Sequence, residues 1–376
     1  MRFIRAICRI LFAIVFICAG MLKLIDPVGT GLIMKEYLSI VHLDCSNMLA
    51  ICLGTGLATL EFTTGICVLI GLKIKVFSAI GLCMTLFFSA VTLYLALYNP
   101  ISDCGCFGQA IHLTNWQTFY KNVILLLLIL LIFFGRKKAT VIAADWLQWV
   151  FVTIFAVMGL IVAINSYIRL PQIDFTQYNV GADLSGKTAG TIPRYETFFT
   201  YEKDGVSREF TLDDLPDSTW TFTGSRTVGD AEGNGAPDLQ LPDTEGRLFT
   251  ISVYEPEAVS AAMKSDMESF IKRCEEAGVN AVILSTEENA DRKTLMTLNR
   301  SNGGITYFDA GVIVAKWGAS RLDDLDPDSI LSEDPDVTVL QKRISEQLYL
   351  TIILVLIFFI MALLRHLCMV FRRKKS

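Results

Sequence analysis

Long apolar stretches alternate with polar segments along the chain, and six of the apolar stretches are long enough to cross a membrane. A transmembrane α-helix needs about 20 consecutive, mostly apolar residues to span the hydrocarbon core. The stretches that qualify are Ile7–Leu24, Leu49–Leu72, Val76–Tyr98, Trp116–Phe134, Trp146–Ile168 and Leu348–Leu364. The pattern therefore predicts an integral membrane protein with six transmembrane helices.

A long polar segment separates the fifth and sixth stretches, and its own pattern predicts a soluble domain. Residues 170–235 form an extended lead rich in Gly and Asp, with short strand-like runs at Thr197–Tyr201 and Ser218–Phe222. Residues 236–345 alternate between strands and helices and end in a hairpin, which is typical of an α/β fold. The expected elements are strands Leu248–Tyr254 and Asn280–Leu284, helices Glu257–Ala277 and Ala290–Asn299, and a hairpin of Ile305–Tyr307 and Gly311–Trp317.

Charge divides the chain in the same way. The net charge is −5, but residues 170–346 contain 16 Lys and Arg against 32 Asp and Glu, whereas the remaining residues contain 17 against 6. Short loops rich in Lys and Arg face the cytoplasm in most membrane proteins. The basic residues beside predicted helix ends are Arg2, Arg5, Arg9, Lys73, Lys75, Arg136, Lys137, Lys138, Arg372, Arg373, Lys374 and Lys375.

These basic residues all fit one topology. Both termini are then cytoplasmic, and residues 26–48, 99–114 and 170–346 lie on the other side of the membrane. We expect a multi-pass protein of a bacterial-type inner membrane with its large domain in the periplasm. The acidic outer domain has no basic patch for nucleic acid.

The first apolar stretch has an alternative interpretation as a cleaved signal peptide, because Met1–Arg5 resembles the charged start of one. The residues that follow the stretch, Met21–Ile25, contain no small-x-small cleavage motif. We therefore expect the stretch to remain as the first transmembrane helix.

The ten cysteines fall into two groups on this topology. Six lie in or beside apolar helices, where cysteine behaves as a small apolar residue; they are Cys8, Cys18, Cys52, Cys67, Cys83 and Cys368. Four lie on the predicted outer side, where thiols can form disulfides; they are Cys45, Cys104 and Cys106 in loops and Cys274 in the soluble domain.

The motif Asp-Cys-Gly-Cys-Phe-Gly, directly after the third stretch, is the most chemically distinctive segment. A disulfide between Cys104 and Cys106 closes a tight, strained ring, and strain makes a disulfide exchange readily. Gly105 eases the closure because glycine adopts backbone angles that other residues avoid. Thr114 and Gln117 predict a capping box at the start of the fourth helix, and a helix N-terminus favours a nearby thiolate.

Three chemical interpretations of the Cys104–Cys106 pair remain open. A redox-active pair exchanges with other thiols, a structural disulfide only holds the loop, and two close thiolates bind Cu(I) or Zn. His112 is the one candidate imidazole near such a metal site. Cys45, in the other outer loop, is a candidate third thiol that relays or resolves the disulfide.

Glu61 is an isolated carboxyl inside the second apolar stretch. Ionisable groups at membrane depth are costly, so they face a bundle interior or a partner. Lys23 and Lys35 are candidate partners, although an up-and-down bundle would place Glu61 well below Lys23. A structural contact between helices and a role at a proton or quinone site both remain open. Asp26 and Pro27 predict the end of the first helix.

Residues 1–135 resemble a known family. The run Gly-Met-Leu-Lys-Leu-Ile-Asp-Pro-Val-Gly-Thr from Gly20 to Thr30, together with Leu-Glu-Phe at Leu60–Phe62, is similar to DoxX-like membrane proteins. The Cys-Gly-Cys-Phe-Gly motif is similar to the methylamine-utilisation protein MauE branch, a relative of the vitamin K epoxide reductase fold. The resemblance implies a four-helix membrane bundle and a role in envelope thiol–disulfide chemistry; no cofactor is certain, and a quinone is the one candidate. The reductase family has a Cys-x-x-Cys motif and a second cysteine pair, whereas this chain has Cys-x-Cys and Cys45.

The soluble segment resembles a thioredoxin-like domain at Ala236–Asp243, where it starts, and at Asp309–Val314 in its closing hairpin. The residues that carry out the redox chemistry of that fold are missing. Tyr254–Glu257 stands where such a domain has Cys-x-x-Cys, and Asn302–Gly304 stands where it usually has a cis-proline. Cys274 falls late in a helix and is expected to be packed. We therefore expect a domain without an active site of its own, which binds or positions a partner.

Two functional hypotheses follow. The first is a membrane-embedded thiol–disulfide redox or maturation protein, whose Cys104, Cys106 and Cys45 act on thiols or disulfides of an unidentified envelope protein. The second is a non-catalytic membrane scaffold or assembly factor whose cysteines are structural. The expected units are residues 1–135 for the four-helix bundle, 146–168 for the fifth helix, 170–235 for the lead, 236–345 for the α/β domain, and 347–371 for the sixth helix and basic tail.

Overall fold

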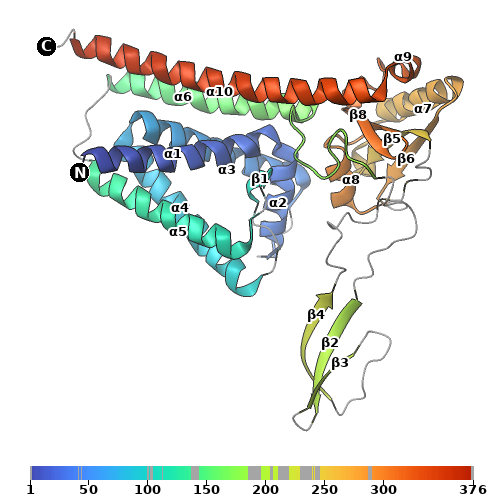
Figure 1. The fold of residues 1–376 in the computed structure, drawn as a ribbon, viewed down its shortest axis with the longest axis horizontal. Helices are drawn as coiled ribbons and strands as arrows, with labels where there is room; N and C mark the ends of the chain where they lie inside the picture. The colour runs from blue at the N-terminus through green and yellow to red at the C-terminus, as the bar shows by residue number, and fades with distance from the viewer. Residues whose placement is uncertain are drawn as a thin grey trace.

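The computed structural model describes most of the chain. The described residues are 2–40, 42–43, 45–99, 101, 105–111, 113–136, 144–184, 196–203, 206–210, 220–228, 239, 241, 246–286 and 290–373. A helical bundle occupies one end of the elongated molecule and a small α/β domain occupies the other (Figure 1).

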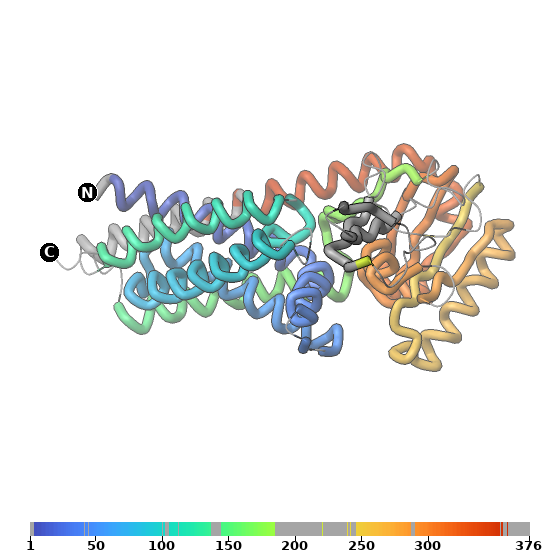
Figure 2. Tube along the Cα trace, turned by 90° about the horizontal axis from the view of Figure 1, so that it is seen from below, coloured from blue at the N-terminus to red at the C-terminus, as the bar shows by residue number. Residues whose placement is uncertain are grey.

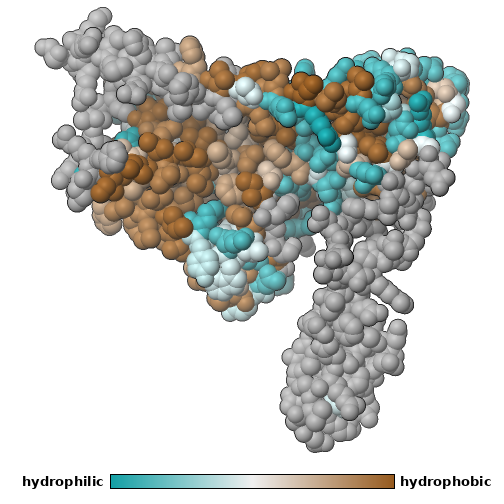
Figure 3. Space-filling model, in the orientation of Figure 1, coloured by the Kyte–Doolittle hydropathy of each residue, from teal (hydrophilic) through white to brown (hydrophobic). Residues whose placement is uncertain are grey.

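Five helices of the bundle are long and apolar enough to cross a membrane, in agreement with the first five predicted spans. They are α1 (Arg2–Ile25), α3 (Asn47–Ile70), α4 (Ile74–Tyr98), α5 (Asn115–Gly135) and α6 (Asp145–Arg169). The predicted sixth span lies within α10 (Pro335–Arg373), a single helix of 39 residues. Apolar side chains cover the visible face of the bundle, and polar ones cover much of the α/β domain (Figure 3). This distribution is that of a multi-pass membrane protein.

Basic residues gather at one end of the bundle, which we call the basic end. Arg9 donates hydrogen bonds to carbonyls in the last turn of α3, at 2.9 and 3.1 Å. Arg5 donates to the carbonyl of Gly135 at the end of α5 (3.3 Å), and Lys73 pairs with Asp145 in the first turn of α6. Helix α1 begins and α10 ends at this same end (Figures 1 and 2). The charge pattern therefore corresponds to a spatial cluster.

Small residues let α1 and α3 pack closely. A Cβ atom on Gly20 would lie 2.6 Å from the backbone nitrogen of Phe62, and one on Gly65 would lie 2.9 Å from the backbone nitrogen of Ile17. Helices inside membranes associate mainly by such close packing, because lipid provides no hydrophobic driving force between them. The close contacts at Gly20 and Gly65 therefore set the axial position of α1 relative to α3.

The predicted outer loop after α1 contains a further helix, α2 (Pro27–Ile40). Pro27 occupies the first helical position, where a missing N–H costs nothing, and the Asp26 carboxylate accepts from the backbone nitrogen of Gly29 at 2.8 Å. Helix α2 packs against the first turns of α3, with Gly31 against Ile51. The end of α1 at Asp26 was predicted correctly, but the following segment is helical rather than a simple loop.

The α/β domain contains a four-stranded sheet in the order β6-β5-β7-β8. Its elements are β5 (Arg247–Val253), α7 (Ala261–Glu276), β6 (Asn280–Ser285), α8 (Arg292–Leu298), β7 (Gly304–Asp309) and β8 (Val312–Trp317). Strands β5 and β6 are parallel, and the other neighbouring pairs are antiparallel. The predicted order of strand, helix, strand, helix and hairpin is confirmed. Short helical segments complete the domain; they are η4 (Pro256–Ala258), η5 (Ala319–Arg321) and α9 (Pro327–Ser332).

Apolar residues cover both faces of this sheet. Helix α7 packs Phe270 against Phe249 on one face, with ring centroids 5.6 Å apart. Helix α8 and the segment after α6 cover the other face, where Tyr178 is buried. That segment also continues the sheet edge, because Ile313 of β8 donates to the carbonyl of Ala182 (2.9 Å).

A separate three-stranded antiparallel sheet lies within the lead segment, in the order β3-β2-β4. Its strands are β2 (Glu196–Lys203), β3 (Val206–Phe210) and β4 (Thr221–Val228). It stands apart from the four-stranded sheet (Figure 1). The sequence predicted two short strand-like runs in an extended segment; β3 was missed because it lacks a strongly apolar face.

Candidate functional site

The Cys-Gly-Cys segment is described from its glycine onward, and Cys104 lies outside the described residues. Gly105 has a φ of +59°, in the left-handed region that favours glycine. A Cβ atom there would also approach the side chain of Ile33 in α2 to 2.4 Å. Glycine is therefore required at position 105 for two reasons: the backbone angle is unfavourable for other residues, and a side chain would clash with Ile33.

The second cysteine begins a short strand, β1 (Cys106–Gln109), at the end of the bundle opposite the basic end. We call this the domain end. Cys106 is half-buried. Within the strand, the Nζ of Lys121 lies 4.6 Å from the centre of the Phe107 ring, and such a cation–π contact is stabilising. The following helix α5 begins with the predicted capping box, in which the Thr114 hydroxyl accepts from the backbone nitrogen of Gln117 (3.3 Å).

Cys45 lies between α2 and α3 and is half-buried. Two residues later, the Asn47 amide donates to the Glu255 carboxylate of the α/β domain and accepts from Lys35 Nζ at 2.6 Å. Glu255 stands at the junction after β5, where a thioredoxin-like domain would have its cysteines. The junction thus contacts the membrane region close to Cys45, and the role of Cys45 as a third thiol stays a prediction.

A buried ion pair joins the bundle to the α/β domain beside β1. Nη2 of Arg300 lies 2.7 Å from Oδ2 of Asp26, and the two side chains are 5% and 9% exposed. The same Nη2 donates to Oε1 of Gln109, the last residue of β1, at 2.6 Å. Gly29 makes room for the pair, because a Cβ there would lie 2.2 Å from Oδ2 of Asp26. The cysteine-bearing strand is therefore bonded directly to the α/β domain.

Further contacts strengthen this junction. Lys293 pairs with Glu36 of α2 at 2.5 Å, and Val28 of α2 belongs to the apolar core on the α8 face of the sheet. The sequence alone does not indicate this junction. Asp26 in the sequence predicts only the end of a helix, and nothing in a charge pattern indicates which distant arginine it meets.

Glu61 is buried inside the bundle and pairs with Lys23 of α1 at 2.7 Å. The expectation that it would lie well below Lys23 was wrong. The first turns of α3 lie beside α2, with Gly54 against Thr30, so Glu61 is shifted towards the domain end and is level with Lys23. The pairing offsets part of the cost of burying both charges. A structural role for Glu61 and a role at a proton or quinone site both stay predictions.

The α/β domain offers no reactive thiol among its described residues. Cys274 is fully buried in the core between α7 and the sheet, as predicted. Burial raises the pKa of its thiol to about 12, so that the nucleophilic thiolate is scarce at neutral pH. At the β5 junction, the Asn302 side chain accepts from the backbone nitrogens of Tyr254 and Glu255 (2.9 and 3.1 Å). The junction is a hydrogen-bonded turn.

All six remaining cysteines were expected to be packed in or beside the helices. Cys8 and Cys67 are buried in the bundle, whereas Cys18, Cys52 and Cys83 are exposed on helix surfaces; the side chain of Cys368 lies outside the described residues. Within the described part of the chain, no group of three or more His, Cys, Asp and Glu side chains is arranged to hold a metal ion. Cys104 and His112, which the metal interpretation would use, lie outside that part.

Comparison with known family models gives matches in the membrane region and in the lead segment. Residues 195–228, which contain β2, β3 and β4, match a domain of unknown function (DUF8463). No curated protein and no solved structure matches the chain. Residues 1–135 match the family of the methylamine utilisation protein MauE, so the part of this membrane protein that contains α1 to α5 and the Cys-Gly-Cys strand is MauE-like.

Proposed function

We propose that the chain is a membrane-embedded thiol–disulfide redox or maturation protein that acts on envelope proteins through Cys104 and Cys106. The observation that carries the proposal is the position of β1. Its half-buried Cys106 lies at the domain end of a MauE-like bundle, and its Gln109 is bonded to Arg300 of the α/β domain. A strand that joins a membrane region to a soluble domain is well placed to meet a protein substrate.

The proposed chemistry is an exchange between a dithiol of the envelope protein and the Cys104–Cys106 disulfide, with a disulfide on a further envelope protein as the final oxidant. A thiolate of the envelope protein attacks one sulfur of the Cys104–Cys106 disulfide, forming a mixed disulfide and releasing the other cysteine as a thiolate. A second thiol of the substrate resolves the mixed disulfide. The substrate loses two electrons and two protons, and the pair gains them as two thiols. A disulfide on a further envelope protein restores the pair by the reverse reaction.

A quinone fits this arrangement poorly. Glu61, the carboxyl that a quinone or a proton pathway would use, is buried and bonded to Lys23 at 2.7 Å. We therefore assign no step to a quinone, and Glu61 acts in this proposal only as a structural contact between α1 and α3.

The α/β domain serves the proposal as a thioredoxin-like domain that binds or positions the partner. Support comes from its strand order and its one parallel pair, β5 with β6. The domain supplies acidic surface for a partner and no exchanging thiol of its own. We expect envelope proteins and membrane lipid as partners, and no nucleic acid.

The alternative function is a non-catalytic scaffold whose cysteines are structural, and the redox behaviour of the pair separates the two. In native membranes, we expect glutathione to reduce the Cys104–Cys106 disulfide without denaturant, as maleimide trapping and mass spectrometry would show. A disulfide that resists glutathione until the protein is unfolded would favour the scaffold.

The orientation proposed here places both termini in the cytoplasm and the α/β domain in the periplasm. It rests on the cluster of arginine and lysine at the basic end. In a background without other accessible cysteines, Lys272→Cys on α7 should react with a membrane-impermeant maleimide in cells whose outer membrane is permeabilised. Ser376→Cys at the chain end should react only after the inner membrane is lysed. Labelling of the chain end before lysis would refute the orientation.

A further inference from the structure

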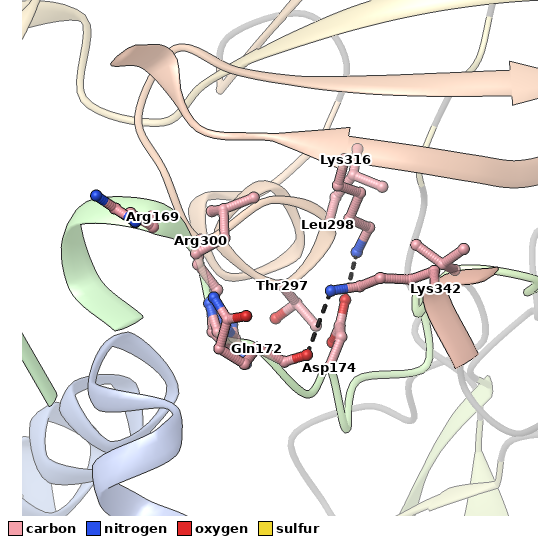
Figure 4. Close-up of a pocket in the computed structure, with 11 residues that line it drawn as sticks. Arg169, Gln172, Asp174, Thr297, Leu298, Arg300, Lys316 and Lys342 are labelled. Atoms are coloured by element: carbon pink, nitrogen blue, oxygen red, sulfur yellow. Dashed lines mark hydrogen bonds and ion pairs between the residues drawn. The ribbon is translucent and has the colours of Figure 1, made fainter. Parts of the chain in front are cut away.

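A cavity of about 70 Å³ lies where the segment after α6 meets α8, β8 and α10. No residue of β1 and no cysteine lines it, although Arg300, which does, is bonded to Gln109 of β1. Its polar lining residues are Arg169, Gln172, Asp174, Thr297, Arg300, Lys316 and Lys342. Figure 4 shows Lys316 and Lys342 turned towards Asp174 and Gln172, whereas Arg169 points away from them.

Two cations face the cavity against one carboxylate. Of the four cationic lining residues, Arg169 points away (Figure 4) and Arg300 is paired with Asp26, which leaves Lys316 and Lys342 beside Asp174. Lys316 lies 2.7 Å from Asp174 and is only 8% exposed. Lys342 donates to the backbone carbonyl of Gln172 at 3.2 Å and lies 3.7 Å from Glu346. The charge of Arg300 is directed at Asp26, outside the cavity.

The titration behaviour of the two buried partners agrees with this imbalance. Desolvation lowers the pKa of Lys316 despite its ion pair with Asp174, and the positive charges of Arg300 and Lys342 lower it further. The pKa of Asp174 is also lowered: desolvation acts against this, but the ion pair with Lys316, the hydrogen bond from the Thr176 backbone and, more weakly, the charge of Arg300 outweigh it. The effect of Arg300 and Lys342 on Lys316 shows a positive potential at this lysine, which favours an anion beside it.

The cavity also lies where two apolar helices leave the bundle. Helix α6 ends at Arg169, and the predicted apolar span of α10 begins at Leu348, six residues after Lys342. Basic pockets beside transmembrane helices, at the level of the headgroups, are suited to phosphate-bearing lipids. Lysine binds phosphate as a point charge, and its hydrogen bonds to an ionised oxygen are strong.

We propose that this cavity binds a phosphate group, carried by an anionic phospholipid or present as inorganic phosphate. Lys342 and Lys316 supply the charge and the N–H donors, and the backbone of the segment after α6 shapes the wall. The site is independent of the thiol chemistry proposed above, and it would hold α6, α10 and the α/β domain together at one point.

The test uses the full chain, purified in neutral detergent and delipidated until mass spectrometry of an extract detects no phospholipid. Its thermal unfolding midpoint is measured with dioctanoyl phosphatidylglycerol, with sodium phosphate, with dioctanoyl phosphatidylcholine and with sodium chloride at matched ionic strength. At a concentration about 100-fold above Kd, a bound ligand should raise the midpoint by about 5 °C or more.

We expect this rise with at least one of the two anionic probes and its loss in Lys342→Gln, whose side chain is 35% exposed and can be replaced without opening the core. Lys342→Arg should retain it. The matched control is Lys272→Gln, an exposed lysine of α7 that also has a glutamate four residues later; this variant should respond as the wild type does. A rise with phosphatidylglycerol and not with phosphate identifies the lipid as the source, and a rise with phosphate shows that the free ion is recognised. If neither probe exceeds chloride, or if Lys342→Gln responds fully, the cavity is not a phosphate site.

Discussion

Replacing either Cys104 or Cys106 by serine should reduce thiol–disulfide exchange with envelope proteins to the background rate. Exchange requires a thiolate on one side and a disulfide on the other, and a serine hydroxyl provides neither. The measurement is the rate at which the purified chain in nanodiscs oxidises a dithiol peptide. In the Cys106→Ser variant, Cys104 can still attack the disulfide of the oxidising envelope protein. The mixed disulfide with that protein should persist, because no second thiol remains in the motif to release it.

The control for this experiment is Cys274→Ser. Cys274 is fully buried against the sheet, and its raised thiol pKa leaves it unreactive. Exchange should therefore continue at the wild-type rate in this variant, provided that the domain remains folded. Loss of exchange in a folded Cys274→Ser variant would assign the chemistry to the α/β domain instead. Cys45→Ser tests whether Cys45 takes part in the exchange. Slower release of the mixed disulfide in this variant would make Cys45 the resolving cysteine.

Replacing Arg300 by methionine should destabilise the junction between the bundle and the α/β domain by about 3–5 kcal/mol. The substitution leaves Asp26 buried without its partner, whose Nη2 lies 2.7 Å away, and it removes the donor to Gln109 of β1. Hydrogen–deuterium exchange should become faster in residues 105–111 and in α2, because local opening of this region then costs less.

A double substitution separates the ion pair from general packing. Asp26→Asn neutralises the buried charge and keeps an oxygen for the Gly29 backbone nitrogen, since asparagine caps helices as well as aspartate does. Asp26→Asn combined with Arg300→Met should therefore cost less than Arg300→Met alone. Arg321→Met, at an exposed arginine of the same domain, should change stability by less than about 0.5 kcal/mol. Equal effects of the single and double variants would show that Arg300 acts through its packing alone.

The sequence alone determined those features that depend on neighbours along the chain. Apolar run length predicted the five bundle helices, because a span must bury its own backbone polar groups. Alternating strand and helix patterns predicted β5 to β8, and the glycine between the two cysteines predicted the left-handed turn at Gly105 (φ +59°). The capping box at Thr114 was likewise visible, since its two partners are three residues apart.

Only the tertiary structure decided which distant residues meet. Asp26 and Arg300 are 274 positions apart, and their pairing depends on how the α/β domain sits against α2. Lys23 and Glu61 pair because glycine contacts set the register of α1 against α3, and a hydrophobic pattern gives a helix its buried face but not its axial position. The cavity between α6, α8, β8 and α10 is assembled from four such elements. Local periodicity fixes the elements, whereas their contacts follow from packing between surfaces that are remote in sequence.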